Sequence, residues 1–141
     1  MSAKFFLDTN IFVYSLDGNT PKARRCTQLI REAIAVRSGV VSYQVVQEFF
    51  NVAFRRFHPP MTLEEAEQYL AATFRPLLSV QSSQALFADS LHLRHKYRLS
   101  WYDSLILAAA IHAQCSILYS EDFQHGQKFD NLRIVNPFQE A

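Results

Sequence analysis

Four acidic side chains in this sequence stand against apolar runs, where carboxylates are uncommon. Asp8 directly follows Phe-Phe-Leu, and Glu48 lies between Val-Val and Phe-Phe. Asp103 separates an aromatic pair from Leu-Ile-Leu, and Asp122 closely follows Ile-Leu-Tyr-Ser. Withdrawing a carboxylate from water costs several kcal/mol unless a cation or dense hydrogen bonding compensates. If the fold gathers these four side chains, we expect a metal site.

The donor types indicate which metal such a site would bind. Carboxylates that lie close together repel one another and their pKa values rise, unless a cation separates them. The chain has two cysteines far apart in sequence and no clear set of histidine ligands. Ligation by oxygen alone favours Mg²⁺ or Mn²⁺ over Zn²⁺.

Two of the acids also have an ordinary structural interpretation as helix caps. Asp8 could be the N-cap of a short helix that follows it. Asp103 lies three residues after Ser100, which is capping-box spacing, and a carboxylate is favourable in a first helical turn. The two roles are compatible, because a carboxylate in the first turn can also point beyond the end of the helix.

The other two acids are placed less firmly by the sequence. On a helical wheel Glu48 falls at the boundary of the apolar face, so it could also be a surface glutamate. Asp122 competes with its neighbour Glu121, and we expect one of the two carboxylates to face the site. We favour Asp122, with an ordinary turn aspartate as the alternative.

Apolar runs that alternate with helical patterns indicate the architecture. Continuous apolar strands between helices are typical of a parallel sheet covered on both faces. We therefore expect one domain over residues 1–141, an α/β/α sandwich around a mostly parallel sheet of about five strands. The expected strands are 4–7, 40–41, 77–80, 117–119 and 132–135, and the expected helices are 11–16, 21–37, 43–57, 62–75, 84–97 and 105–113.

This architecture brings two of the acids to one edge of the sheet. In open α/β sheets, ligands bind outside the carboxyl ends of the strands. Asp8 and Asp122 both come just after an expected strand and so lie on that edge.

Composition limits the classes of partner and compartment. The formal net charge is +1, which argues against broad electrostatic binding of nucleic acid but leaves room for a local basic rim. Cys26 and Cys115 are interpreted as buried thiols in a reducing compartment. Asp8 and Asn10 interrupt the apolar N-terminus before a signal peptide would be complete, and no run is long enough to cross a membrane. We expect a cytoplasmic protein.

Four segments resemble the acidic motifs of the PIN domain family. Residues 6–14, FLDTNIFVY, resemble its opening motif, and residues 100–110, SWYDSLILAAA, resemble its third motif. Residues 45–51 and 118–123 resemble the second and fourth motifs. The order, spacing and length are similar to those of small prokaryotic PIN proteins, the VapC-type toxins of toxin–antitoxin pairs, and the resemblance covers essentially the whole chain.

The resemblance implies a metal-dependent, single-strand-selective ribonuclease. Asp8 and Asp103 match its principal metal ligands, and Glu48 and Asp122 match residues that complete the acidic pocket, partly through water. The adjacent Glu121 departs from the fourth motif. The polar positions that orient ligands or water correspond to Asn10 and Ser120.

The implied chemistry agrees with the residue types. One or two hard cations held by carboxylates lower the pKa of bound water and neutralise charge as a phosphodiester is hydrolysed. The resemblance also implies an antitoxin partner and a homodimer. We expect the Phe-rich segment 43–57 to offer a hydrophobic groove to an amphipathic partner segment.

Other functions fit the sequence less well. A phosphatase with Asp8 as nucleophile needs a general acid two residues later, where Asn10 stands. A phospho-acceptor signalling domain needs a late lysine near the pocket, and Lys128 lies in an expected loop. A PIN fold that only binds partners would not require the complete set of four carboxylates.

Overall fold

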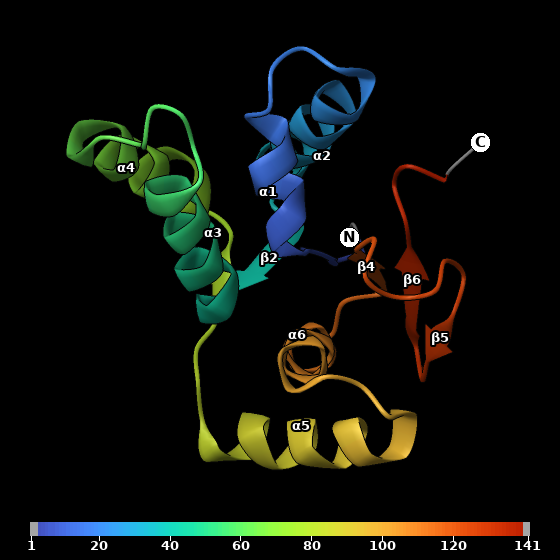
Figure 1. Ribbon diagram of the computed structural model, residues 1–141. Coiled ribbons are helices and arrows are strands. Elements are labelled where there is room, and N and C mark those ends of the chain that lie inside the picture. The colour runs from blue at the N-terminus through green and yellow to red at the C-terminus, as the bar shows by residue number, and fades with distance from the viewer. Residues whose placement is uncertain (1–2, 140–141) are drawn as a thin grey trace.

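A six-stranded sheet organises the computed structural model, which describes residues 3–139 (Figure 1). The strand order is β3-β2-β1-β4-β6-β5, and every neighbouring pair is parallel except β5 and β6. This confirms the α/β architecture with a mostly parallel sheet. The strands are β1 (Phe5–Leu7), β2 (Gly39–Ser42), β3 (Leu78–Val80), β4 (Ile117–Tyr119), β5 (Lys128–Phe129) and β6 (Leu132–Val135).

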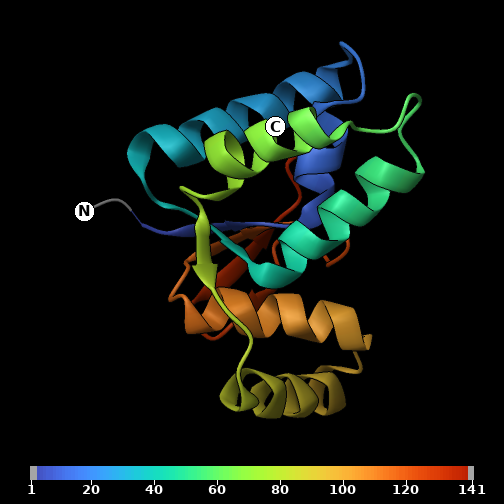
Figure 2. The same cartoon turned by 90° about the vertical axis from the view of Figure 1, so that its left-hand side faces the viewer.

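Helices cover both faces of the sheet. Figure 1 shows α1 and α2 on one side and α5 and α6 on the other, and Figure 2 shows α6 lying between α5 and the sheet. Residues 104–110 of α6 are all buried, as expected for a helix that is apolar on nearly every face. The helices are α1 (Thr9–Ser15), α2 (Pro21–Val36), α3 (Tyr43–Arg55), α4 (Leu63–Tyr69), the π-helical turn η1 (Leu70–Phe74), α5 (Gln84–Tyr97) and α6 (Trp101–His112).

Local signals in the sequence start these helices where they are observed. Thr20 caps α2 by accepting a hydrogen bond from Ala23 N, and Pro21 occupies the first helical position. Thr62 and Glu65 form the expected capping box at α4, with both reciprocal hydrogen bonds present. These caps satisfy backbone N–H groups that a helix leaves unpaired at its start.

The structure differs from the sequence-based prediction in three places. The sheet has six strands rather than about five, because Lys128–Phe129 forms a two-residue strand too short to show any period. Helix α6 begins at Trp101, immediately after its cap, rather than at residue 105. The helix expected to continue to Pro76 instead ends in the π-helical turn η1.

This π-helical turn carries Phe74 into an aromatic cluster that joins α3 and α4 to the core. The ring of Phe49 stacks on Tyr69 with centroids 4.6 Å apart and meets Phe74 edge-on at 5.3 Å. Phe74 also contacts Phe12 of α1 at 5.0 Å. The aromatic residues therefore fix α3, which carries Glu48, against α1.

Within residues 3–139, no helix has the length and apolar character needed to cross a membrane.

Gly39 allows α2 to approach the start of β2 closely, which generates a prediction for stability. A Cβ at this position would lie 2.2 Å from the Cβ and 2.9 Å from the Cα of Ala33. We expect Gly39→Ala to lower the free energy of unfolding by about 3 kcal/mol, measured by chemical denaturation. Adding Ala33→Gly should recover part of this loss.

Gly126→Ala is the matched control for this prediction. Gly126 has φ +84°, and a Cβ at this position would have no heavy atom within 4 Å, so only backbone strain of about 1 kcal/mol is expected. If Gly39→Ala is no more destabilising than Gly126→Ala, the close approach of α2 does not constrain this position.

Candidate active site

The acidic residues lie where the strand order of the sheet reverses. From β1 the chain moves outward through β2 to β3, and it then returns to place β4 on the other side of β1. Such a switch point is where open α/β sheets bind ligands. Asp8 directly follows β1 and Ser120 directly follows β4, and Asp8 N donates to Tyr119 O at 3.1 Å. The two strand ends are therefore joined at the site.

Asp8 is buried, and both of its carboxylate oxygens accept hydrogen bonds. Its side chain is almost inaccessible to solvent, and its Oδ2 accepts from Ser120 Oγ at 2.6 Å. Its Oδ1 accepts from Thr9 N at 2.7 Å, so Asp8 is also the N-cap of α1. Burial and, to a smaller extent, the charges of Asp122 and Glu48 together raise the pKa of Asp8 to about 7, despite the two hydrogen bonds that favour its ionised form.

Glu48 is joined to the same cluster through a residue that sequence analysis did not single out. Thr9 Oγ1 donates to Glu48 Oε1 at 2.7 Å, while Thr9 N holds Asp8. Glu48 is half-buried on the second turn of α3, in agreement with its position at the edge of the apolar face. One threonine therefore positions carboxylates from two different elements, and only the three-dimensional contact reveals it.

Asp122 and Glu121 point to different partners. Glu121 accepts hydrogen bonds from Tyr14 Oη and, at 3.3 Å, from Lys22 Nζ, which holds it against α1 and α2. Asp122 N instead donates to Ser120 Oγ at 3.1 Å. Partial withdrawal from water and the charges of Asp103, Glu121 and Glu48 raise the pKa of Asp122. The carboxylate of Glu121 is therefore occupied by Tyr14 and Lys22, whereas the charges of Asp103 and Glu48 act on Asp122.

Asp103 lies in the first turn of α6, and its carboxylate is not used for capping. Ser100 Oγ accepts from Asp103 N at 3.1 Å, whereas no hydrogen bond to the Asp103 carboxylate is found within residues 3–139. The buried Gln44 donates from Nε2 to Tyr102 O at 3.2 Å and so ties the start of α6 to the start of α3. Gln44 is a second positioning residue that the sequence did not reveal.

The four carboxylates are the type of donor that a hard divalent cation prefers, but they do not lie close enough together in this structure to surround one. Neighbouring carboxylates raise the pKa values of Asp8 and Asp122, and a cation would relieve this repulsion. Within the described residues, however, no three His, Cys, Asp or Glu side chains stand close enough together to hold a metal ion. Asn10 lines an adjoining cavity with Val52 and Arg56.

Asp8 sets an expected pH dependence of stability when divalent cations are removed by EDTA. Its folded-state pKa of about 7 exceeds the ordinary value of 3.8, so the folded protein holds an additional proton between these values. The contribution of Asp8 to the free energy of unfolding therefore falls as pH rises from about 4 to 7, by about 4 kcal/mol in total. Chemical denaturation at a series of pH values measures it.

Asp8→Asn is the matched control, because it keeps the shape of the side chain and cannot ionise. We expect this variant to lack the Asp8 component of the slope and to be more stable than the wild type at pH 8 in EDTA. Identical pH profiles for the two proteins would show that Asp8 does not titrate as its burial requires.

Comparisons with known proteins identify relatives of this fold. A toxin–antitoxin complex from Klebsiella pneumoniae aligns with a TM-score of 0.67 and 21% identity, covering 96% of this chain and 98% of that chain. FitAcB from Neisseria gonorrhoeae gives 0.65 and 14%, covering 96% and 99%. VapC20 of Mycobacterium tuberculosis, a sarcin-ricin loop cleaving toxin, gives 0.60 and 16%, covering 86% and 90%. No curated protein sequence matches the chain.

These identities show a shared fold, and the family follows from a separate match. The family model of the PIN domain matches residues 5–129, which include all four acids and the strands that position them. The expectation from the sequence motifs is confirmed: the chain belongs to the PIN domain family.

Proposed function

We propose that this chain is a Mg²⁺- or Mn²⁺-dependent endoribonuclease that hydrolyses phosphodiester bonds in single-stranded or structured RNA. The observation that carries this proposal is the buried carboxylate of Asp8 at the β1–β4 switch point, with the charges of Glu48 and Asp122 acting on it. A bound divalent cation stabilises such a cluster of carboxylates better than protonation of the separate carboxylates does.

Four carboxylates would hold the metal in this proposal. Asp8 and Asp103 are the principal ligands, and Glu48 and Asp122 complete the site, partly through water. The bound cation would lower the pKa of a water molecule and neutralise charge that develops on the phosphate. Because the set is open within the described residues, the half-exposed Asp103 and the exposed Asp122 would have to move closer to Asp8 to hold the ion.

The uncharged residues of the cluster position these ligands. Ser120 fixes the rotation of the Asp8 carboxylate, and Thr9 fixes Glu48. Outer partners of this kind are worth about 10- to 100-fold in metal affinity or activity at other metal sites. Asn10, two residues after Asp8 in the first turn of α1, would orient a ligand or water.

The relatives support a role as the toxin of a toxin–antitoxin pair. One similar structure is a toxin–antitoxin complex and another is a toxin that cleaves the sarcin-ricin loop. By this likeness we propose that the chain acts in the cytoplasm, forms a homodimer and is inhibited by an antitoxin protein.

A groove lined by both apolar and polar side chains is the proposed antitoxin site. Two adjoining cavities of about 540 and 810 Å³ both have Leu16, Phe57 and Pro59 in their walls. The groove runs between α1, the end of α3 and the segment α4–η1, so it overlaps the expected 43–57 region at its C-terminal end only. An amphipathic helix that places apolar side chains here would pass beside Asn10, next to the acids.

The non-nuclease alternatives make different measurable claims. A phosphatase would turn over a phosphomonoester through an acyl-phosphate on Asp8, and it would need a general acid at the position of Asn10. A binding module without catalysis would bind RNA or protein and cleave nothing with any metal. Assays on p-nitrophenyl phosphate and on RNA separate the three functions.

The ribonuclease proposal predicts a specific pattern among acid variants. With labelled single-stranded RNA we expect cleavage in Mg²⁺ or Mn²⁺ and none in EDTA. Asp8→Asn and Asp103→Asn should each lower kcat/KM by more than about 100-fold, because they remove direct ligands. Ser120→Ala should lower it about 10- to 100-fold.

Glu121→Gln is the control for Asp122→Asn, since these neighbours differ in their contacts. We expect Asp122→Asn to impair cleavage and Glu121→Gln to leave it within a few fold of the wild type, because Glu121 pairs with Tyr14 and Lys22. Full metal-dependent cleavage by folded Asp8→Asn and Asp103→Asn variants would disprove the site. The reverse ranking of the 121 and 122 variants would reassign the fourth acid.

The groove proposal predicts that substitution of Leu16 weakens binding of the partner more than substitution of Leu63 does. Leu16 is 46% exposed and lines both cavities, so Leu16→Glu should weaken binding of the inhibitory partner at least about tenfold while cleavage remains. Leu63→Glu is the control, because Leu63 is 75% exposed outside the groove. Calorimetric titration measures both, and equal affinities for the two variants would place the partner elsewhere.

A further inference from the structure

The outer helix α5 exposes a mixed apolar and basic stripe beside the start of α6. Phe87 and Leu91 are one turn apart and are 39% and 58% exposed, Arg94 follows them at helical spacing, and Arg98 is the C-cap residue just beyond the end of the helix. The ring of Phe87 lies 6.3 Å from that of Trp101, the first residue of α6. The stripe therefore begins next to the turn that carries Asp103.

Tyr102 lies in the first turn of α6, directly after Trp101. It directly precedes Asp103 and is 63% exposed, although its backbone carbonyl is held by the buried Gln44. Its backbone is therefore fixed while its ring is available to solvent. A single exposed aromatic residue is ordinary, but this one stands in sequence between a candidate catalytic carboxylate, Asp103, and Trp101, whose ring lies 6.3 Å from that of the exposed Phe87.

The basic residues at the end of the stripe form no salt bridge in the part of the chain that the structure describes. Arg94, His95, Lys96 and Arg98 surround a hollow of about 580 Å³ at the end of α5, and none of the four forms a salt bridge within residues 3–139. Positive charges in the last turn of a helix interact favourably with the helix macrodipole. Their side chains extend outward, so they can also bind a negatively charged ligand. Because the whole chain carries only +1, this is a local concentration of positive charge.

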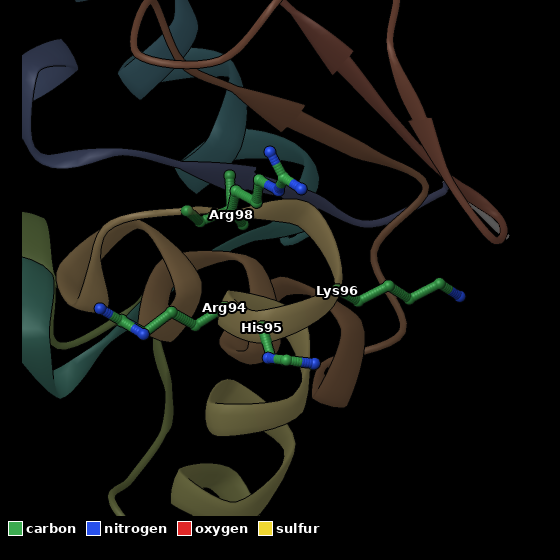
Figure 3. Close-up of a pocket in the computed structure, with 5 residues that line it drawn as sticks. Arg94, His95, Lys96 and Arg98 are labelled. Carbon is green, nitrogen blue, oxygen red and sulfur yellow. The ribbon is translucent and has the colours of Figure 1, made fainter.

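The directions of these side chains indicate the shape of the ligand. Figure 3 shows that they fan out, with Arg94 and Lys96 on opposite sides and Arg98 pointing away from both. A compact anion would require convergent donors, whereas an extended polyanion can meet divergent ones one after another. Alternating charge and aromatic surface is how proteins bind single-stranded nucleic acid without reading its sequence.

Because the acidic cluster repels RNA, the protein needs a separate surface that binds it. Four carboxylates repel a phosphodiester, and the nearby Lys22 is already paired with Glu121. Affinity for RNA must therefore come from outside the cluster. The chain between Arg98 and Tyr102 spans at most about 14 Å between Cα atoms, so both can contact one strand.

We propose that single-stranded RNA leaves the acidic cluster over Tyr102, with one base stacked on its ring, and continues along α5 to phosphate contacts with Arg94 and Arg98. This inference rests on the proposed ribonuclease function and names the substrate-binding surface of that site. Tyr102 and the two arginines are positioning residues, since they hold the RNA strand and do not contact the reacting atoms.

The first test changes the ring of Tyr102 and measures binding of a fluorescent single-stranded RNA to the intact chain in EDTA. Tyr102→Ala should weaken binding about 5- to 100-fold, while Tyr102→Phe and Tyr102→Trp should retain it. Tyr102→Leu keeps apolar bulk but not the aromatic face, so it should behave like alanine. RNA with an abasic nucleotide at the stacked position should bind the wild type and Tyr102→Ala equally well.

The second test compares two arginines in the same backbone conformation. Arg98 and Arg37 are both C-cap residues with φ of 56° and 57°, but Arg37 ends α2 just before β2, at the amino end of the strand. Arg98→Ala should lower the slope of log Kd against log salt by about 0.7, and Arg37→Ala should not change it. Tyr102→Ala should weaken binding with the slope unchanged.

The outcomes distinguish failure of the surface from failure of the function. If the wild type cleaves RNA with metal while the Tyr102 and Arg98 variants match it in kcat/KM, KM and Kd, the surface is wrong and the nuclease proposal stands. If the variants lose binding but no protein cleaves RNA, the surface stands and the catalytic proposal fails. Loss of self-association in place of RNA binding would assign the stripe to a second copy of the chain and overturn the inference.

Discussion

The hydrogen bond between Ser120 and Asp8 joins the two strands on which the site is built. It places the Asp8 carboxylate where β1 and β4 end side by side, and burial, together with the charges of Asp122 and Glu48, raises the pKa of Asp8 to about 7. The surrounding elements share this constraint. Thr9 begins α1 by donating to Asp8 and positions α3 through Glu48, while Gln44 ties α3 to the first turn of α6. A cation that satisfies Asp8 would therefore act on several elements at once.

The burial of this charge is unfavourable for folding by itself, which is why it points to function. A neutral Asn or Ser at position 8 could cap α1 about as well and would remove a desolvated charge. Natural sequences keep such conflicts mainly where a ligand or a reaction resolves them. Here the chemistry of phosphodiester hydrolysis gives the proposed resolution, and the exposed stripe on α5 would supply the affinity that four carboxylates cannot.

Local chemistry made most of the fold predictable, and it indicated Asp8 and Asp103 as candidate site residues. Asp8 and Asp103 could be found because each follows a strong signal, a buried strand in one case and a cap in the other. The helical wheel placed Glu48 at the boundary of the apolar face of its helix, but it could not show that Thr9 is its hydrogen-bond partner. The sequence alone could not separate Asp122 from Glu121, since the difference lies in Tyr14 and Lys22, distant residues that occupy Glu121. The two-residue strand β5 was not predicted, because two residues are too few to show a periodic pattern of apolar and polar side chains.

The most direct test of the central claim is a crystal structure of this chain soaked in Mn²⁺, with anomalous diffraction recorded to locate the ion. We expect one principal anomalous peak between the carboxylates of Asp8 and Asp103, with Glu48 and Asp122 nearby and Glu121 still paired with Tyr14 and Lys22. The peak should be lost in Asp8→Asn crystals. A peak only at other residues, or no bound ion at saturating Mn²⁺ with the fold intact, would contradict the proposed metal site.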